Sequence, residues 1–166
     1  TALSNMPEEH SKFVDVEFGS VKKQMKEVKF APSPIMSTYL VAYIIGEFEH
    51  VASETKSGVQ VRVYSPPGRI EEARFALDTA VKCLEMYDTF FGVKYPLPKL
   101  DMIAVTEFAA GAMENWGLVT YREEAILLAK NASPKQKMRV AVVVNHELAH
   151  QWFGNLVTMD WWDDLW

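Results

Sequence analysis

The sequence has little of several residue classes that mark specialised proteins. Among 166 residues there is one cysteine, Cys83, which excludes an internal disulfide framework and favours a reducing compartment. Lysine and arginine number 17 against 22 acidic residues, which gives a net charge of −5. This balance argues against a nucleic-acid partner, because neutralising phosphates requires clustered basic side chains. With 49% apolar and 23% charged residues, the composition is instead that of a folded globular protein.

Long apolar runs are also missing. The longest uncharged stretch, Ala31–Gly46, contains two prolines and is shorter than the roughly 20 apolar residues that a membrane span needs. Residues 1–20 lack the basic start and apolar core of a signal peptide, so we expect no membrane segment in this chain. The chain opens at Thr1 without methionine and stops at Trp166 within an aromatic-rich stretch, and we therefore expect it to be a fragment of a longer protein.

Several short segments have the residue pattern of β strands. Asp15–Phe18 and Glu27–Phe30 alternate charged and apolar side chains, which predicts half-buried strands. Thr38–Ile45 is rich in β-branched and aromatic residues, which predicts a strand buried on both faces. Further strands are expected at Val59–Tyr64, Met102–Val105 and Leu118–Tyr121.

Two helices are predicted. Apolar residues recur at intervals of three and four over residues 70–91, and Gly92 follows as a terminator. A second helix is expected over residues 134–153, because Ser133, Pro134 and Gln136 form the pattern of a capping box with proline at the first position. Gly154 is available to end this helix.

The segment His146-Glu-Leu-Ala-His150 lies on the second predicted helix. Histidines at i and i+4 project from one helix face, where both imidazoles reach one metal ion. Neutral imidazole is a good zinc ligand, and a zinc site with three protein ligands leaves its fourth position for water. The ion lowers the pKa of that water to about 7. Glu147 directly follows the first ligand and is placed to accept the proton of that water.

Two histidines do not complete such a site. A collagenase-like zincin requires glycine and histidine where this chain has Phe153 and Leu156, which excludes that class. The carboxylates of Asp160, Asp163 and Asp164 follow the motif, either as ligands or, as we favour, in a supporting or solvated position.

A second motif, Gly111-Ala-Met-Glu-Asn115, lies between two predicted strands. Its small residues allow a ligand to approach the backbone closely, and Glu114 offers a carboxylate that can pair with a cationic group. Taken alone, this pattern also describes a tight loop with a solvated glutamate.

Together the two motifs resemble those of zinc aminopeptidases of the aminopeptidase N and puromycin-sensitive type, which are gluzincins. The resemblance covers essentially the whole chain. It rests on Gly111–Asn115, His146–His150 and Gln151–Met159, with support from Leu3–Pro7, Met36–Ala42 and Tyr95–Lys99.

The resemblance implies a role for each matching residue. His146 and His150 would bind one zinc ion per full-length chain, and Glu147 would be the general base. Glu114 would hold the free α-amino group of a peptide substrate. Gly111, Ala112 and Met113 would lie along the substrate backbone, with Asn115 completing that wall. The third ligand of the family is a glutamate nineteen positions after the second histidine, beyond residue 166, so the fragment alone should be nearly inactive.

The implied fold is α+β, with residues 1–48 completing a β-rich N-terminal domain. Residues 49–166 would form the first part of a thermolysin-like catalytic domain. The resemblance implies an aminopeptidase acting on peptides with a free N-terminus, in the cytoplasm. Two alternatives stay open: a non-catalytic zinc- or peptide-binding homologue, and an epoxide hydrolase-type relative, against which Ala112 argues because that branch has glycine there.

Overall fold

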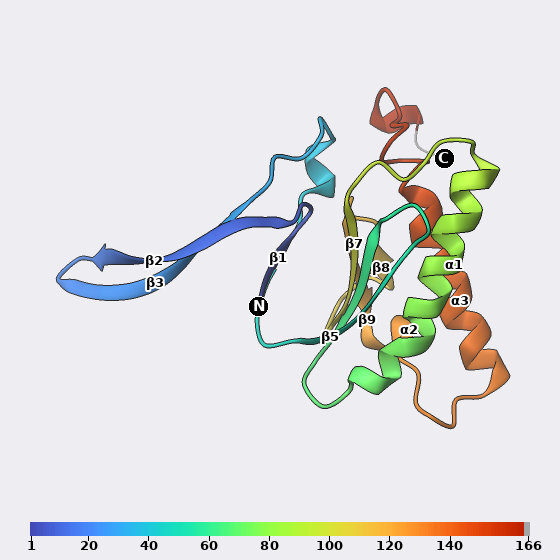
Figure 1. Ribbon diagram of the computed structural model, residues 1–166, viewed down its shortest axis with the longest axis horizontal. Coiled ribbons are helices and arrows are strands. Elements are labelled where there is room, and N and C mark those ends of the chain that lie inside the picture. The colour runs from blue at the N-terminus through green and yellow to red at the C-terminus, as the bar shows by residue number, and fades with distance from the viewer. Residues whose placement is uncertain (165–166) are drawn as a thin grey trace.

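A computed structural model describes residues 1–164, and its centre is a five-stranded mixed sheet (Figure 1). The strand order is β5-β6-β7-β9-β8, with β7 parallel to β6 and β9 and with both outer pairs antiparallel. Sheets and helices in one chain confirm the predicted α+β class, and three predicted strands recur in β6, β7 and β9. The strand bounds are Glu49–Glu54, Gln60–Ser65, Lys99–Val105, Ala112–Met113 and Leu118–Arg122 for β5 to β9 in chain order.

Two long helices cover one face of this sheet (Figure 1). The 3₁₀ helix η2 (Ile70–Ala73) leads directly into α1 (Arg74–Phe90), which confirms the helix predicted over residues 70–91. Gly92 follows in the left-handed region, with φ of +67°, which suits glycine at the end of a helix. The short helix α2 (Glu123–Ile126), which the sequence did not reveal, follows β9.

Helix α3 (Pro134–His150) begins as predicted. The Ser133 hydroxyl accepts a hydrogen bond from the backbone N–H of Gln136, whose side chain accepts one from the backbone N–H of Ser133. The helix ends three residues before the predicted residue 153. The backbone N–H groups of Gln151 and Trp152 donate to carbonyls three residues earlier, so the last turn tightens to 3₁₀ geometry.

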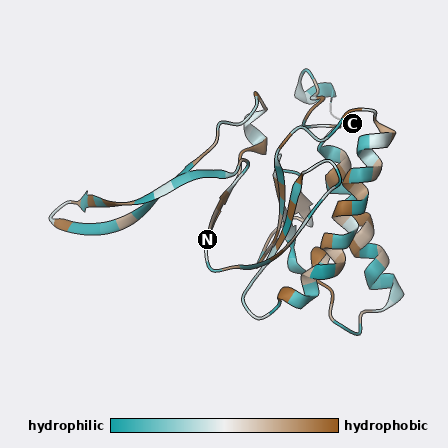
Figure 2. Cartoon of the chain, viewed as in Figure 1, coloured by the Kyte–Doolittle hydropathy of each residue, from teal (hydrophilic) through white to brown (hydrophobic). Residues whose placement is uncertain are grey.

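The main core lies between the sheet and the two helices. Figure 2 shows hydrophobic residues recurring along α1, α3 and the sheet strands. Val61, Met102 and Tyr121 from the sheet and Leu84 and Leu148 from the helices are almost wholly buried in one cluster. This packing fixes α3, and hence its C-terminal end, relative to β9.

The opposite face of the sheet carries a smaller pair of strands, β1 (Ala2–Ser4) and β4 (Tyr43–Ile45). Leu3 of β1 packs with Ile103 and Leu118 of the sheet in a second cluster. Strand β5 is the first strand of the five-stranded sheet in chain order, and the domain division between residues 48 and 49 stays a prediction.

The strand predicted over residues 38–45 is wrong for most of its length. Thr38–Leu40 form a 3₁₀ helix, η1, and the following Tyr43 and Ile45 are 76% and 79% exposed in a three-residue strand. The reason lies in side-chain hydrogen bonds: the Asn5 amide group donates to Leu40 O and accepts from the backbone N–H of Ala42. These bonds replace ladder pairing, so β-propensity alone does not decide the conformation.

The N-terminal residues also contain a long hairpin of β2 (Glu8–Phe18) and β3 (Val21–Phe30). It projects away from the five-stranded sheet and is mostly hydrophilic (Figures 1 and 2). Two strands were predicted here, and both are longer than expected. The predicted alternation is confirmed in β3, where Val28 and Phe30 are partly buried between exposed charged residues. It holds only in part in β2, where Val16 is partly buried but Phe18 is 56% exposed. No helix within residues 1–164 has the length and apolar character to cross a membrane.

Candidate active site

His146 and His150 lie one turn apart near the C-terminal end of α3. Their Nε2 atoms are 3.2 Å apart and their ring planes are nearly perpendicular, at 88°. Two imidazole nitrogens bound to one tetrahedral zinc ion at 2.0–2.1 Å would be about 3.3 Å apart. The two nitrogens therefore fit adjacent positions on one zinc ion.

The tautomer of His150 follows from its surroundings. Its Nδ1 lies 2.9 Å from the carbonyl oxygen of Phe153, and a carbonyl oxygen only accepts. Nδ1 must therefore carry the hydrogen, which leaves the lone pair of a neutral imidazole on Nε2. A hydrogen bond of this kind orients a histidine ligand and raises its basicity.

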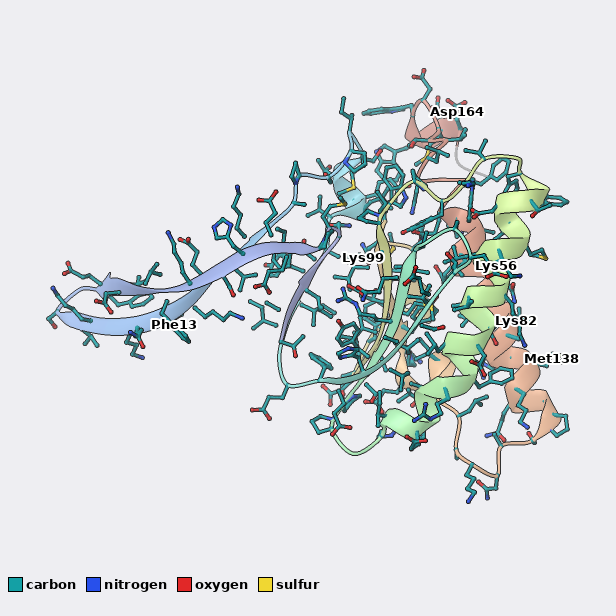
Figure 3. All side chains as sticks on the ribbon, in the orientation of Figure 1. Phe13, Lys56, Lys82, Lys99, Met138 and Asp164 are labelled. Atoms are coloured by element: carbon teal, nitrogen blue, oxygen red, sulfur yellow. The ribbon has the colours of Figure 1, made fainter. Side chains whose placement is uncertain are left out.

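No third potential ligand joins the histidine pair in the part of the chain that the structure describes. Within residues 1–164, no three side chains of histidine, cysteine, aspartate or glutamate come together closely enough to hold a metal ion. Asp160, Asp163 and Asp164 are exposed, and Figure 3 shows Asp164 at the periphery of the molecule, in η3 (Trp162–Asp164).

Glu147 is turned into the protein and is only 6% exposed, although both flanking motif histidines are more accessible. Burial raises the pKa of its carboxyl to about 7, and the negative charge of Glu114 adds to this rise. Burial also raises the pKa of Tyr121, with a further contribution from the Glu147 charge. The carboxylates of Glu147 and Glu114 come from different elements of the fold and lie close enough to influence each other.

The segment Gly111–Asn115 forms one edge of the five-stranded sheet. Ala112 and Met113 make up β8, which pairs antiparallel with Tyr121 and Thr120 of β9. Within the described residues β8 has a strand neighbour on one side only. A Cβ atom added to Gly111 would meet no atom within 4 Å, so the start of this edge faces open space.

Glu114 follows β8 and is partly buried. Its main-chain carbonyl oxygen accepts hydrogen bonds from Asn155 Nδ2 at 2.8 Å and from Gln151 Nε2 at 3.1 Å. Its negative charge also raises the pKa of Tyr39, second to the effect of burial on that phenol. Glu114 thus lies within electrostatic reach of both Glu147 and Tyr39.

Asn115 faces the interior and is 6% exposed. Its amide group donates to Leu40 O at 3.4 Å and accepts from the Thr120 hydroxyl at 3.3 Å. The side chain therefore ties the loop to η1 and β9, and within the described residues it does not extend into the open space beside β8.

Three residues near the site lie within the segments that carry the resemblance but were given no role of their own from the sequence: Gln151, Asn155 and Tyr39. Gln151 and Asn155 stand four residues apart immediately after the second histidine, and both are almost completely buried, at 0% and 2% exposed. The sequence signal was two carboxamide side chains four residues apart in a stretch rich in apolar residues. Tyr39 reaches the site from η1, where its hydroxyl donates to Gly154 O at 3.4 Å.

The arrangement combines three chemical capacities. The histidine pair presents two imidazole nitrogens spaced to bind a divalent ion, and Glu147 presents a buried carboxylate able to accept a proton. Glu114 presents a second negative charge at the end of a sheet edge that is open to an extended chain.

Sequence comparisons agree with this chemistry. Residues 75–166, more than half of the chain, match the Peptidase family M1 domain. The chain is 55% identical over its full length to a puromycin-sensitive aminopeptidase of Caenorhabditis elegans, of which it covers 17%. It is 52% identical over 99% of its length to aminopeptidase M1 of Arabidopsis thaliana and to endoplasmic reticulum aminopeptidase 1 of Homo sapiens. It spans 18% and 17% of these two relatives.

Proposed function

Because the chain belongs to peptidase family M1, we propose that it forms part of a zinc-dependent aminopeptidase, which removes N-terminal residues from peptides. The observation that supports this most strongly is the convergence of His146 Nε2 and His150 Nε2, 3.2 Å apart, next to the buried Glu147. Since the chain spans about one sixth of its relatives' length, the activity belongs to a longer protein that includes these residues.

In this proposal His146 and His150 are two of three zinc ligands, and the third comes from outside residues 1–164. When bound, the ion supplies a Lewis acid that acidifies the attacking water. The hydrogen bond from His150 Nδ1 to Phe153 O orients the imidazole and would leave its Nε2 free to bind the ion.

Glu147 acts as the general base. Its carboxylate accepts a proton from the attacking water and then passes that proton to the leaving amine. Its burial supports this role, because a base shielded from bulk solvent keeps the proton for the leaving group.

Glu114 acts as the anchor for the substrate amine. The α-ammonium is the one cation that every peptide with a free N-terminus carries, and a partly buried carboxylate pairs with it strongly. An extended peptide that hydrogen-bonds along β8 would begin at this carboxylate. A fixed separation between Glu114 and the histidine pair then selects cleavage after the first residue.

A chimera tests the proposal. Residues 1–166 replace the aligned segment of the C. elegans puromycin-sensitive aminopeptidase, and hydrolysis of leucine p-nitroanilide is measured with and without a chelator. We expect hydrolysis that the chelator abolishes and that zinc restores. A folded chimera without hydrolysis would contradict the proposal.

A variant of the chimera tests the role of Glu147 as the base. Glu147→Gln should lower kcat by about 10²–10⁴-fold, the range that general base catalysis contributes. Glu124→Gln, at an exposed glutamate of α2, is the matched control and should keep full activity. With two zinc ligands in its described part, the 166-residue chain by itself should show almost no hydrolysis.

A further inference from the structure

The main-chain carbonyl of Glu114 is held by two side-chain amides from the segment that follows the second histidine. Asn155 donates to this oxygen at 2.8 Å and Gln151 donates to it at 3.1 Å. An acceptor with two lone pairs is thereby fully occupied. The amine anchor of the proposed site is thus attached to the end of α3, which also carries both histidines.

Gln151 makes this attachment at more than one point. Its Nε2 also donates to Glu147 O at 3.1 Å, and its Oε1 accepts from the backbone N–H of Gly117 at 3.4 Å. One buried side chain therefore contacts the main chain of the proposed base and two positions of the loop that carries Glu114. Such a network transmits the position of α3 to the loop.

Asn155 is a poor choice for stability alone. Its Oδ1 is buried and has no hydrogen-bond partner within residues 1–164, so the amide loses solvation without full compensation. A leucine of similar size would avoid this loss at the same place. Among the side-chain contacts of Asn155 within residues 1–164, the hydrogen bond from Nδ2 to Glu114 O is the one that a leucine could not make.

We propose that Gln151 and Asn155 are positioning residues that fix Glu114 relative to the histidine pair, and so set where the substrate amine binds. The inference rests on the proposed function. Strand β8 is only two residues long and is open on one side in the described structure, so its own pairing holds Glu114 weakly. A displacement of about 1 Å at a positioning contact can cost up to 10²-fold in rate.

The test uses two competitive inhibitors of the chimera: leucine hydroxamate, and 4-methylpentanoyl hydroxamate, which is the same molecule without the amine. Asn155→Leu should weaken leucine hydroxamate about tenfold and leave the amine-free inhibitor within twofold. For leucine p-nitroanilide, KM should rise about tenfold while kcat changes less than threefold. Asn145→Leu is the matched control, because it removes a hydrogen bond that a side-chain amide donates to Ala141 O within α3. It should not change the affinity for either inhibitor.

Two further variants sharpen the result. Gln151→Met keeps the side-chain length without its hydrogen bonds and should show the same selective loss. In a Glu114→Gln background, Asn155→Leu should add no further loss of leucine hydroxamate binding. The reason is that Asn155 acts only through the contact between the Glu114 carboxylate and the inhibitor amine, which is already lost.

Each outcome has a separate meaning. If the unmodified chimera does not hydrolyse leucine p-nitroanilide, the proposed function fails. If it does, and Asn155→Leu weakens both inhibitors equally or neither, only the positioning role is overturned. Loss of folded structure in both the Asn155 and Gln151 variants, by circular dichroism, would mark these amides as residues that the fold requires and would equally overturn it.

Discussion

Replacing Lys99 with methionine tests how the loop that carries Glu114 is held on the face of the sheet opposite the helices. The Lys99 side chain is 3% exposed, and Figure 3 shows it between the sheet and the N-terminal strands. Its ammonium donates to Ser4 O at 2.6 Å and Gly117 O at 2.7 Å, and pairs with Asp101 at 2.8 Å. All three of its N–H groups therefore have partners.

The magnitude follows from these contacts. Methionine fills a similar volume, so no large cavity opens, but two buried carbonyl oxygens lose a donor at about 1–3 kcal/mol each. Asp101 keeps a two-point contact with Arg62, at 2.6 and 2.8 Å, so its charge stays paired. The substitution also removes the cost of burying a charged ammonium, which offsets part of this loss of stability. That cost is visible in the pKa of Lys99, which burial lowers despite the neighbouring Asp101. We expect a net loss of about 3 kcal/mol in the free energy of unfolding.

Urea denaturation of the 166-residue chain at pH 7, followed by tryptophan fluorescence, measures this loss. Lys56→Met is the control, because its ion pair with Glu85 is at the surface, and we expect a change within experimental error. A Lys99→Met variant as stable as the unmodified chain would refute the reasoning. It would mean that the desolvation cost of the ammonium fully offsets the contribution of its three polar contacts.

Three other predictions concern single positions. Ser133→Ala removes the capping box of α3 and should lower the free energy of unfolding by about 1 kcal/mol, measured by urea denaturation, with no change refuting it. Gly117→Ala should cost more, because φ is +82° and the new Cβ would lie 2.3 Å from Asn5 O; a soluble variant of unchanged melting temperature would contradict this. Burial raises the pKa of Cys83 to about 12, so a thiol reagent at pH 8 should label it only in urea. The unfolded thiol ionises near pH 8.5, so above that pH the unfolded chain binds fewer protons than the folded chain. The free energy of unfolding should therefore fall as the pH rises above 8.5.

The two long helices were predictable because their signals are local. Apolar periodicity located α1, and the capping box of Ser133 located the start of α3. The spacing of His146 and His150 within one helix was likewise enough to predict that their side chains come together. These features depend on residues within one or two turns of each other.

Features that depend on distant contacts were not predictable. The sequence predicted β7 only from residue 102, because Lys99 and Asp101 are charged, yet both are buried in an ion network with Arg62. The attachment of Glu114 to Gln151 and Asn155 joins residues about 40 positions apart. Local patterns carry no information on which main-chain oxygen a buried amide will meet.

The strand prediction for residues 38–45 was wrong for the same reason. Its composition favours a strand, but the Asn5 side chain takes the hydrogen bonds of Leu40 and Ala42. A single polar residue more than thirty positions away thus outweighed the local propensity of eight residues.

In the proposed aminopeptidase, His146 and His150 together hold the zinc ion. The most direct measurement is the zinc content per chain of the dialysed chimera, by elemental analysis, beside the same chimera with both histidines replaced by glutamine. We predict one zinc per chain in the first and none in the second, with both folded by circular dichroism. Zinc retained at one per chain after both replacements would contradict the account.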